Sequence, residues 1–135
     1  MIAIASMGNP LRGDDGLPER VVKMLEDSGF FDADFFYGEP MNFLGKLAAY
    51  DPILLVDAVV FDESPGSVKV FNLDDLEGAP LSTHSFSLGF VKKLLSGKRV
   101  FVIGVCPASI DFSDVPSLDA ALVLPYVKKA ISSCL

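Results

Sequence analysis

Ile53-Leu-Leu-Val-Asp-Ala-Val-Val60 is the stretch of this sequence that decides the fold. All of its residues except Asp57 are apolar, and they do not alternate with polar residues as they would on a strand with one wet face. Such a run is typical of a central strand in a parallel sheet, because that strand is buried on both faces. Successive parallel strands must in turn be joined by crossover connections, which are usually helices.

The flanking segments supply this alternation of strand and helix. Further strands are predicted at residues 2–7, 33–37, 67–73 and 99–105, and helices at 17–28, 40–49, from Ser82 or Thr83 to about 95, and from about 117 to 133. The strand at 67–73 alternates apolar and polar residues, so we expect it at an edge of the sheet. The pattern predicts an α/β fold, with a single doubly wound domain over residues 1–135. Its sheet should be five-stranded and mainly parallel, with helices on both faces.

Composition narrows the class of protein. Half of the residues are hydrophobic, which is typical of an ordered globular domain. The net charge is −7 and there is no basic run, so we expect no nucleic-acid partner. Cys106 and Cys134 are too few for a disulfide framework. No apolar stretch approaches the roughly 18 residues of a membrane span. We therefore expect a cytoplasmic protein without membrane insertion.

Acidic and imidazole side chains follow or end the predicted strands. Residues 8–16, Gly-Asn-Pro-Leu-Arg-Gly-Asp-Asp-Gly, resemble a phosphate-binding loop, but Asp14 and Asp15 stand where that loop carries Lys and Ser or Thr. Asp57 interrupts the apolar central strand, and His84 is the only histidine of the chain. Ligands of open α/β sheets bind outside the carboxyl ends of the strands. These side chains are therefore expected on one rim of the sheet.

Asp57 is the strongest of these candidates. A carboxylate inside a buried strand is costly unless a cation, a set of donors or the open end of the sheet compensates for it. Together, Asp15, Asp57 and His84 would offer two oxygens and one nitrogen, which suits a borderline divalent ion such as nickel or zinc. Two simpler interpretations stay open. Asp14 and Asp15 could serve the start of the following helix, and His84 could be a capping or surface residue.

Cys106 ends the last predicted strand, in Gly104-Val-Cys-Pro107, on the same rim. It could act as a nucleophile with His84 as its base, or it could be a small buried residue at a strand end. Patterns of the Ser-His-Asp or His-Glu-x-x-His kind are missing from the sequence. The standard protease chemistries are therefore not expected.

Four motifs, taken in order, resemble the hydrogenase maturation endopeptidases. They are Gly8-Asn9-x-Leu11-x-Gly13-Asp14-Asp15-Gly16, Leu55-Val-Asp57-Ala58, Thr83-His84 and Gly104-Val-x-Pro107. These proteases trim the large subunit of nickel-iron hydrogenases, and the resemblance covers nearly the whole chain. Two positions differ from the common pattern. Tyr37-Gly38-Glu39 replaces Asp-Gly-Gly, and Cys106 stands where relatives often carry Gln.

The resemblance implies a substrate and a site. The partner would be a hydrogenase large-subunit precursor, which is cut near its C-terminus after nickel has been inserted. Asp15, Asp57 and His84 would be the catalytic and metal-contacting residues. The nickel would be carried by the substrate and serve as the recognition element, and zinc or cadmium could mimic it.

Two other functions fit parts of the pattern. Receiver domains of signalling proteins also have an acidic pair after the first strand and a phosphorylated aspartate ending the third, which Asp57 would match. They need a lysine after the last strand, however, where this chain has Val105-Cys-Pro107. A non-catalytic nickel-sensing accessory protein that docks the precursor without cutting it is also compatible with the sequence. The oligomeric state is not predicted.

Overall fold

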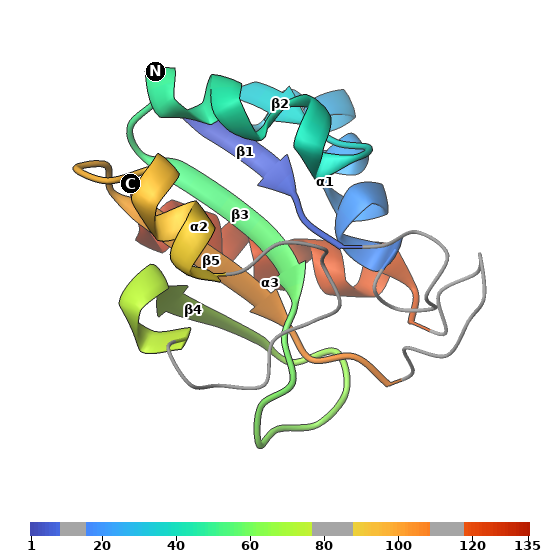
Figure 1. The fold of residues 1–135 in the computed structure, drawn as a ribbon. Helices are drawn as coiled ribbons and strands as arrows, with labels where there is room; N and C mark the ends of the chain where they lie inside the picture. Colours follow the sequence, from blue (N-terminus) through green and yellow to red (C-terminus); the bar gives the residue numbers. More distant parts are fainter. Residues whose placement is uncertain (9–15, 77–87, 109–117) are drawn as a thin grey trace.

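The segment at 53–60 contains the central strand of a mainly parallel sheet. The computed structural model describes residues 1–8, 16–76, 88–108 and 118–135. The strands of this part of the chain are β1 (Ala3–Ser6), β2 (Asp34–Phe36), β3 (Ile53–Ala58), β4 (Val68–Asn72) and β5 (Val100–Val105). They lie in the order β2-β1-β3-β5-β4, and β4 runs antiparallel to β5 while the other pairs are parallel (Figure 1). The predicted five-stranded sheet, with its edge strand at 67–73, is confirmed.

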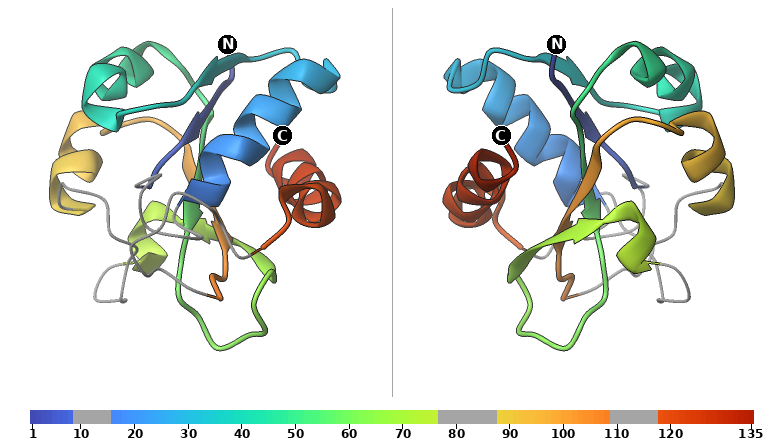
Figure 2. Two further views of the ribbon diagram at one scale, coloured as in Figure 1. Left: turned by 90° about the vertical axis from the view of Figure 1, so that its right-hand side faces the viewer. Right: turned by 90° about the vertical axis from the view of Figure 1, so that its left-hand side faces the viewer.

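Helices cover both faces of this sheet (Figure 2). One face carries α1 (Leu17–Ser28) and α3 (Ala120–Ser133), and the other carries α2 (Leu88–Leu94) with the 3-10 helices η2 (Pro40–Asn42) and η3 (Leu44–Ala49). A further 3-10 helix, η4 (Leu73–Leu76), follows β4. Within the described ranges, no helix combines the length and the apolar character that a membrane span requires.

The side chains of β3 show why two layers of helices are needed. All six residues of the strand are buried. Ile53 and Leu55 belong to the hydrophobic core under η3 and α2, whereas Leu54 and Val56 belong to the core under α1 and α3. Successive side chains of a strand point to opposite faces, so an apolar strand without alternation needs cover on both. The predicted α/β class is therefore confirmed.

Most predicted helices are present, and one differs in type. Helix α1 has the predicted bounds and ends at Gly29, whose φ of 66° is the left-handed conformation of a helix end. The segment at 40–49 was predicted as one helix but forms η2 and η3 instead. Phe43 interrupts it at a φ of −128°, which places both Phe43 and Leu44 in the core. Tertiary packing outweighs the helical spacing there.

The ends of the last two predicted helices can be compared only in part. Helix α3 begins at Ala120, where the carboxylate of Asp119 accepts a hydrogen bond from Ala121 N at 2.9 Å. This is later than the predicted start near residue 117, which lies outside the described residues. The predicted caps of α2, Ser82 and Thr83, also lie outside them.

A tight turn carries the chain from β3 back to the edge strand. Ser67 N donates to Ser64 O at 3.0 Å across the predicted Pro65-Gly66 turn, and Gly66 has a φ of 89°. Gly66 N donates to Cys106 O at 2.8 Å, and Cys106 N donates to Ser67 O at 2.9 Å. Gly66 and Ser67 thus face one residue of the partner strand, which is a bulge of the type that requires glycine. The bulge sets the register between β4 and β5.

An ion pair joins the starts of β3 and β5. Arg99 Nε donates to Asp51 Oδ1 at 2.8 Å, and this hydrogen bond is the main reason why the pKa of Asp51 is lowered. A lowered carboxylate pKa means that the pair stabilises the fold above the ordinary pKa of aspartate. That contribution is lost as the pH falls through the folded-state pKa. It is small, because both side chains are exposed.

We therefore predict that Arg99→Gln lowers the Tm slightly at pH 7 and leaves it unchanged at pH 2. The pKa of Asp51 should return toward its ordinary value. Thermal unfolding across this pH range, with carboxyl NMR of both proteins, measures the two effects. A difference in Tm that persisted undiminished at pH 2 would show that Arg99 acts through packing and not through the ion pair.

Candidate functional site

Asp57 lies at the carboxyl end of β3, one residue before the strand ends. Its side chain is 3% exposed, and it is the only charged side chain among the buried residues of the described chain. Ile53 and Leu55 point into the core under η3 and α2, so strand alternation places Asp57 on the same face. Asp57 does have an interaction partner in the structure, as the cost of burying a carboxylate demands.

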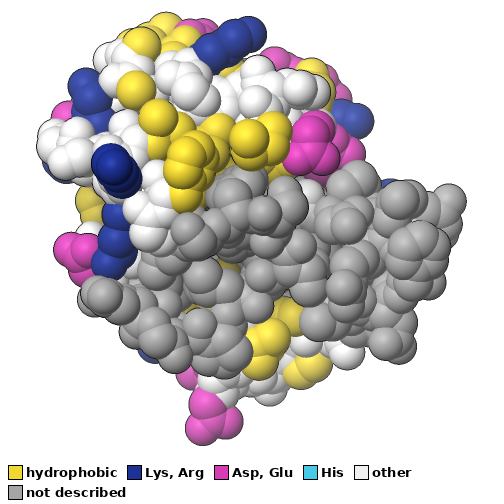
Figure 3. Space-filling model, in the orientation of Figure 1, with side chains coloured by type: hydrophobic (Ala, Val, Ile, Leu, Met, Phe, Trp, Pro, Cys, Tyr) yellow, Lys and Arg dark blue, Asp and Glu magenta, His cyan; other side chains and the backbone are white. Residues whose placement is uncertain are grey.

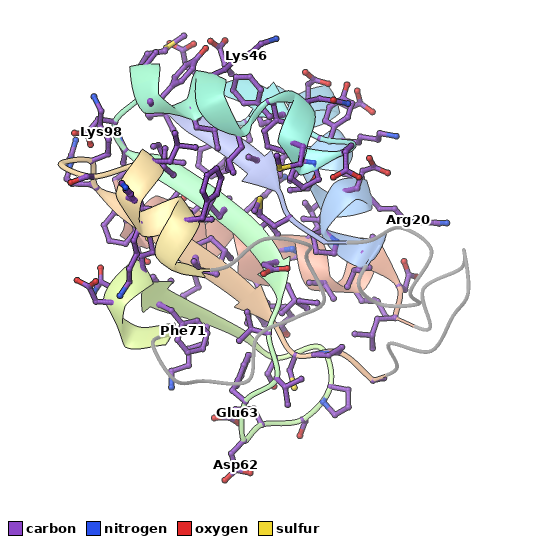
Figure 4. The ribbon with its side chains drawn as sticks, in the orientation of Figure 1. Arg20, Lys46, Asp62, Glu63, Phe71 and Lys98 are labelled. Atoms are coloured by element: carbon purple, nitrogen blue, oxygen red, sulfur yellow. The ribbon has the colours of Figure 1, made fainter. Side chains whose placement is uncertain are left out.

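Glycine lies beside Asp57 on the neighbouring strand. Gly104 of β5 is in register with Asp57 and with Lys69 of β4. A Cβ atom at Gly104 would lie 2.8 Å from Phe71 Cε2 and 3.1 Å from two side-chain carbons of Val59. The ring of Phe71, labelled in Figure 4, therefore occupies the space that a side chain at position 104 would need.

Phe71 belongs to an apolar cluster that borders the carboxyl rim. Its ring packs edge-on against Phe61, with the centroids 5.6 Å apart, and the ammonium group of Lys69 lies 5.3 Å from the centroid of Phe71. This cluster covers Gly104, the neighbour of Asp57 on β5. Sequence analysis did not find it. Gly104 within an apolar strand was the available signal, because such a glycine often marks a close approach.

Cys106 is buried behind the loop that follows β3. Its side chain is 5% exposed, and Sγ lies 3.6 Å from Phe61 O and 3.6 Å from Glu63 O. A thiol is a weak donor that can serve one of these carbonyls at a time. The position agrees with the interpretation of Cys106 as a small buried residue at a strand end. Through these contacts Cys106 joins the end of β5 to the loop that follows β3.

The other predicted site residues lie outside the described part of the chain. These are Asp14, Asp15 and His84. Their convergence with Asp57 therefore stays a prediction. Within the described ranges, no group of three or more His, Cys, Asp or Glu side chains could hold a metal ion. The chain does leave β1 close to Asp57, because Met7 N donates to Val56 O at 2.8 Å.

The chain matches a known protein family. The hydrogenase maturation protease family matches residues 38–133. This range contains Asp57, His84 and the Gly104–Pro107 motif, and it begins after the loop that carries Asp15.

Two named proteins are similar in sequence. A candidate hydrogenase maturation protease of Methanocaldococcus jannaschii is 29% identical over an aligned length of 129, and the match covers 84% of this chain and 76% of that protein. The coenzyme F420 hydrogenase subunit delta of Methanothermobacter thermautotrophicus is 29% identical over an aligned length of 147, and the match covers 96% of this chain and 87% of that subunit.

Solved structures share the fold. The nickel-iron hydrogenase maturation protease HycI of Thermococcus kodakarensis superposes with a TM-score of 0.74 at 26% identity, over 98% of this chain and 90% of that one. The maturating endopeptidase HybD of E. coli gives a TM-score of 0.76 at 22% identity, also over 98% and 90% of the two chains. At that lower identity the likeness to HybD concerns the fold alone.

The close contact at Gly104 can be tested by filling it. Gly104→Ala should lower the free energy of unfolding by about 1–3 kcal/mol, because the added methyl group meets Phe71 and Val59. Adding Phe71→Leu, which removes the ring, should recover part of this loss. Chemical denaturation measures both effects. Gly45→Ala is the matched control, since nothing lies within 4 Å of a Cβ there. Equal stability of the two alanine variants would contradict the packing argument.

Proposed function

This chain belongs to the hydrogenase maturation protease family, and from that membership we propose which protein it cuts and how. It is an endopeptidase that removes the C-terminal extension of a hydrogenase large-subunit precursor. The proposed trigger is nickel insertion, so the enzyme acts once the nickel of a nickel-iron hydrogenase is in place. The observation that carries this proposal is Asp57, a carboxylate buried at the carboxyl end of the central strand inside the region that matches the family.

We assign the recognition of nickel to Asp15, Asp57 and His84. Two carboxylates and one imidazole suit a borderline divalent ion that keeps further positions open for substrate groups. Zinc or cadmium would be accepted as mimics for the same reason. The metal arrives with the substrate in this proposal, so the free enzyme needs no resident ion. The burial of Asp57 supports the assignment, since a carboxylate in a water-excluded position interacts strongly with a cation.

Hydrolysis then needs a polarised carbonyl or an activated water. A divalent ion next to the scissile segment can supply either one. The role of the enzyme in this proposal is to hold the ion and the scissile segment of the precursor together. Asp57 is suited to this, because β3 is paired with β5 through Ala58 and with β1 up to Val56, which fixes the backbone around Asp57. We propose a cytoplasmic location for the reaction, which the two free cysteines support.

The decisive experiment compares two forms of one precursor. The purified enzyme should remove the extension from the nickel-loaded large subunit and leave the nickel-free form uncut. Asp57→Asn, Asp15→Asn and His84→Ala should abolish processing without loss of folding, because residues at a strand-end rim contribute little to the core. Mass spectrometry of the product and circular dichroism of each variant measure the two properties. Processing of the nickel-free precursor would contradict the proposed trigger.

Two control variants sharpen this experiment. Asp14→Asn should be milder than Asp15→Asn, since we expect Asp14 to serve the start of α1. Asp32→Asn, an exposed acid elsewhere on the surface, should leave processing unchanged. A wild-type protein that bound the nickel-loaded precursor and never cut it would instead be the non-catalytic accessory protein.

The thiol gives a separate test of the chemistry. Cys106→Ala should keep most of the processing activity and lower the free energy of unfolding by about 1 kcal/mol, because a buried side chain is shortened. A cysteine protease would lose its activity altogether with this change. Rates on the nickel-loaded precursor, together with thermal unfolding, distinguish the two outcomes. A folded but inactive Cys106→Ala variant would overturn the metal-centred mechanism.

A further inference from the structure

A groove opens between the β3–β4 loop and the first half of α3. Its volume is about 650 Å³, and its apolar lining comes from both sides. Phe61, Pro65 and Val68 contribute from the loop and β4, and Leu122 and Tyr126 contribute from α3. Leu122 is 71% exposed and Tyr126 is 64% exposed. Leu122 has the largest exposed fraction of the large apolar side chains in the described chain.

The open edge of β4 runs along this groove. In the described sheet, β4 has only β5 as a neighbour. Cys106 N donates to Ser67 O, so these two residues form a hydrogen-bonded pair. Bonded and non-bonded pairs alternate along an antiparallel ladder. The N–H and C=O groups of Val68 and Val70 therefore point away from β5, toward the open side.

The exposed apolar residues of α3 lie over this same edge. Val123, Val127 and Ile131 are buried against the sheet. Ala120 packs on the same core, and the exposed Ala121 lies on the flank of the helix toward α1. One turn of 3.6 residues places Leu122 and Tyr126 on the opposite flank, above the space beside β4. A strand added about 4.8 Å beyond β4 would lie under their side chains.

One loop joins the groove to the candidate catalytic rim. This loop lines the groove and follows directly from β3, within a few residues of Asp57. Phe61 lines the groove and packs on Phe71, which covers Gly104 beside Asp57. In the order of the sheet, β5 and β4 lie between Asp57 of β3 and a peptide added beyond β4.

The charged residues around the groove indicate which side chains a peptide bound there would carry. Asp62 and Glu63 project from the loop between β3 and β4 (Figure 4). Among the described residues that line the groove, Glu63 and Asp119 are acidic and Lys69 is basic. Much of the positive charge lies elsewhere, on Lys92, Lys93, Lys98 and Arg99, and dark blue side chains gather at the left of Figure 3 over α2. An acidic groove favours a ligand with basic side chains.

We propose that the edge of β4 and this groove bind the C-terminal segment of the precursor as an added strand. The inference rests on the proposed function, which requires the enzyme to hold a peptide in an extended form. Edge-strand addition supplies affinity through main-chain hydrogen bonds and selectivity through alternate side chains. The segment carries an apolar side chain that packs on Leu122 and Tyr126, and a basic side chain two residues away, on the same face, that lies near Glu63 and Asp119.

Two sets of substitutions test the site with the nickel-loaded precursor. Val70→Pro removes an outward N–H group, and proline is tolerated at such an edge position. Leu122→Ser with Tyr126→Ser removes the apolar flank. Each should raise KM by about fivefold or more with little change in kcat, because binding is lost and the chemistry is not touched. Phe30→Ser, at a side chain that is 58% exposed near the C-terminal end of α1, is the matched control and should keep the wild-type KM.

A binding measurement separates this inference from the proposed function. A labelled synthetic peptide with the sequence of the precursor's C-terminal segment should bind Asp57→Asn protein and shift the amide NMR signals of Val68 and Val70. If the wild type processes the precursor and the groove variants keep its KM, the docking site is overturned while the function stands. If peptide binding shifts these signals and no precursor is cut, the docking site stands and the function fails. A wild-type dimer that Val70→Pro makes monomeric, at unchanged KM, would show that a second copy occupies the edge and would overturn the proposal.

Discussion

A strand that is buried on both faces, as β3 is, needs hydrogen-bonded neighbours on both edges and helices above and below it. The order of the sheet and the two hydrophobic cores follow from this requirement. The same burial makes Asp57 costly, because a carboxylate one residue from the end of such a strand is removed from water. The strand that stabilises the fold therefore also holds a carboxylate whose burial must be compensated by an interaction.

Much of the fold could be predicted from the sequence, because its strands and helices have different hydrophobic periods. The bounds of α1 were predicted in full, and every strand was found within two residues. The prediction of an α-helix at 40–49 was wrong in type. Its apolar residues have the spacing of an α-helix. The burial of Phe43 in the core, however, divides the segment into two short 3-10 helices. Such packing depends on residues far away in the chain, which local periodicity does not include.

The candidate site could be predicted only where one residue contradicted its surroundings. Asp57 was found because a charge stood inside an apolar run, and its burial agrees with that reasoning. Gly104 and Phe71 gave a weaker signal, since their contact joins two strands that are distant in the sequence. Leu122 and Tyr126 gave none, because an exposed flank of α3 matters only beside the open edge of β4. Asp15 and His84 stay predictions.

The loop between β3 and β4 connects the strand of Asp57 to the groove, and the contacts of Cys106 show how this loop is held. Sγ of Cys106 faces the carbonyl groups of Phe61 and Glu63, while the backbone of Cys106 bonds to Gly66 and Ser67. One residue thus anchors both ends of the loop. The family resembled by the sequence often carries Gln at this position, and an amide also offers N–H donors to carbonyl groups. These contacts of Cys106 hold the loop that lies between Asp57 and the groove.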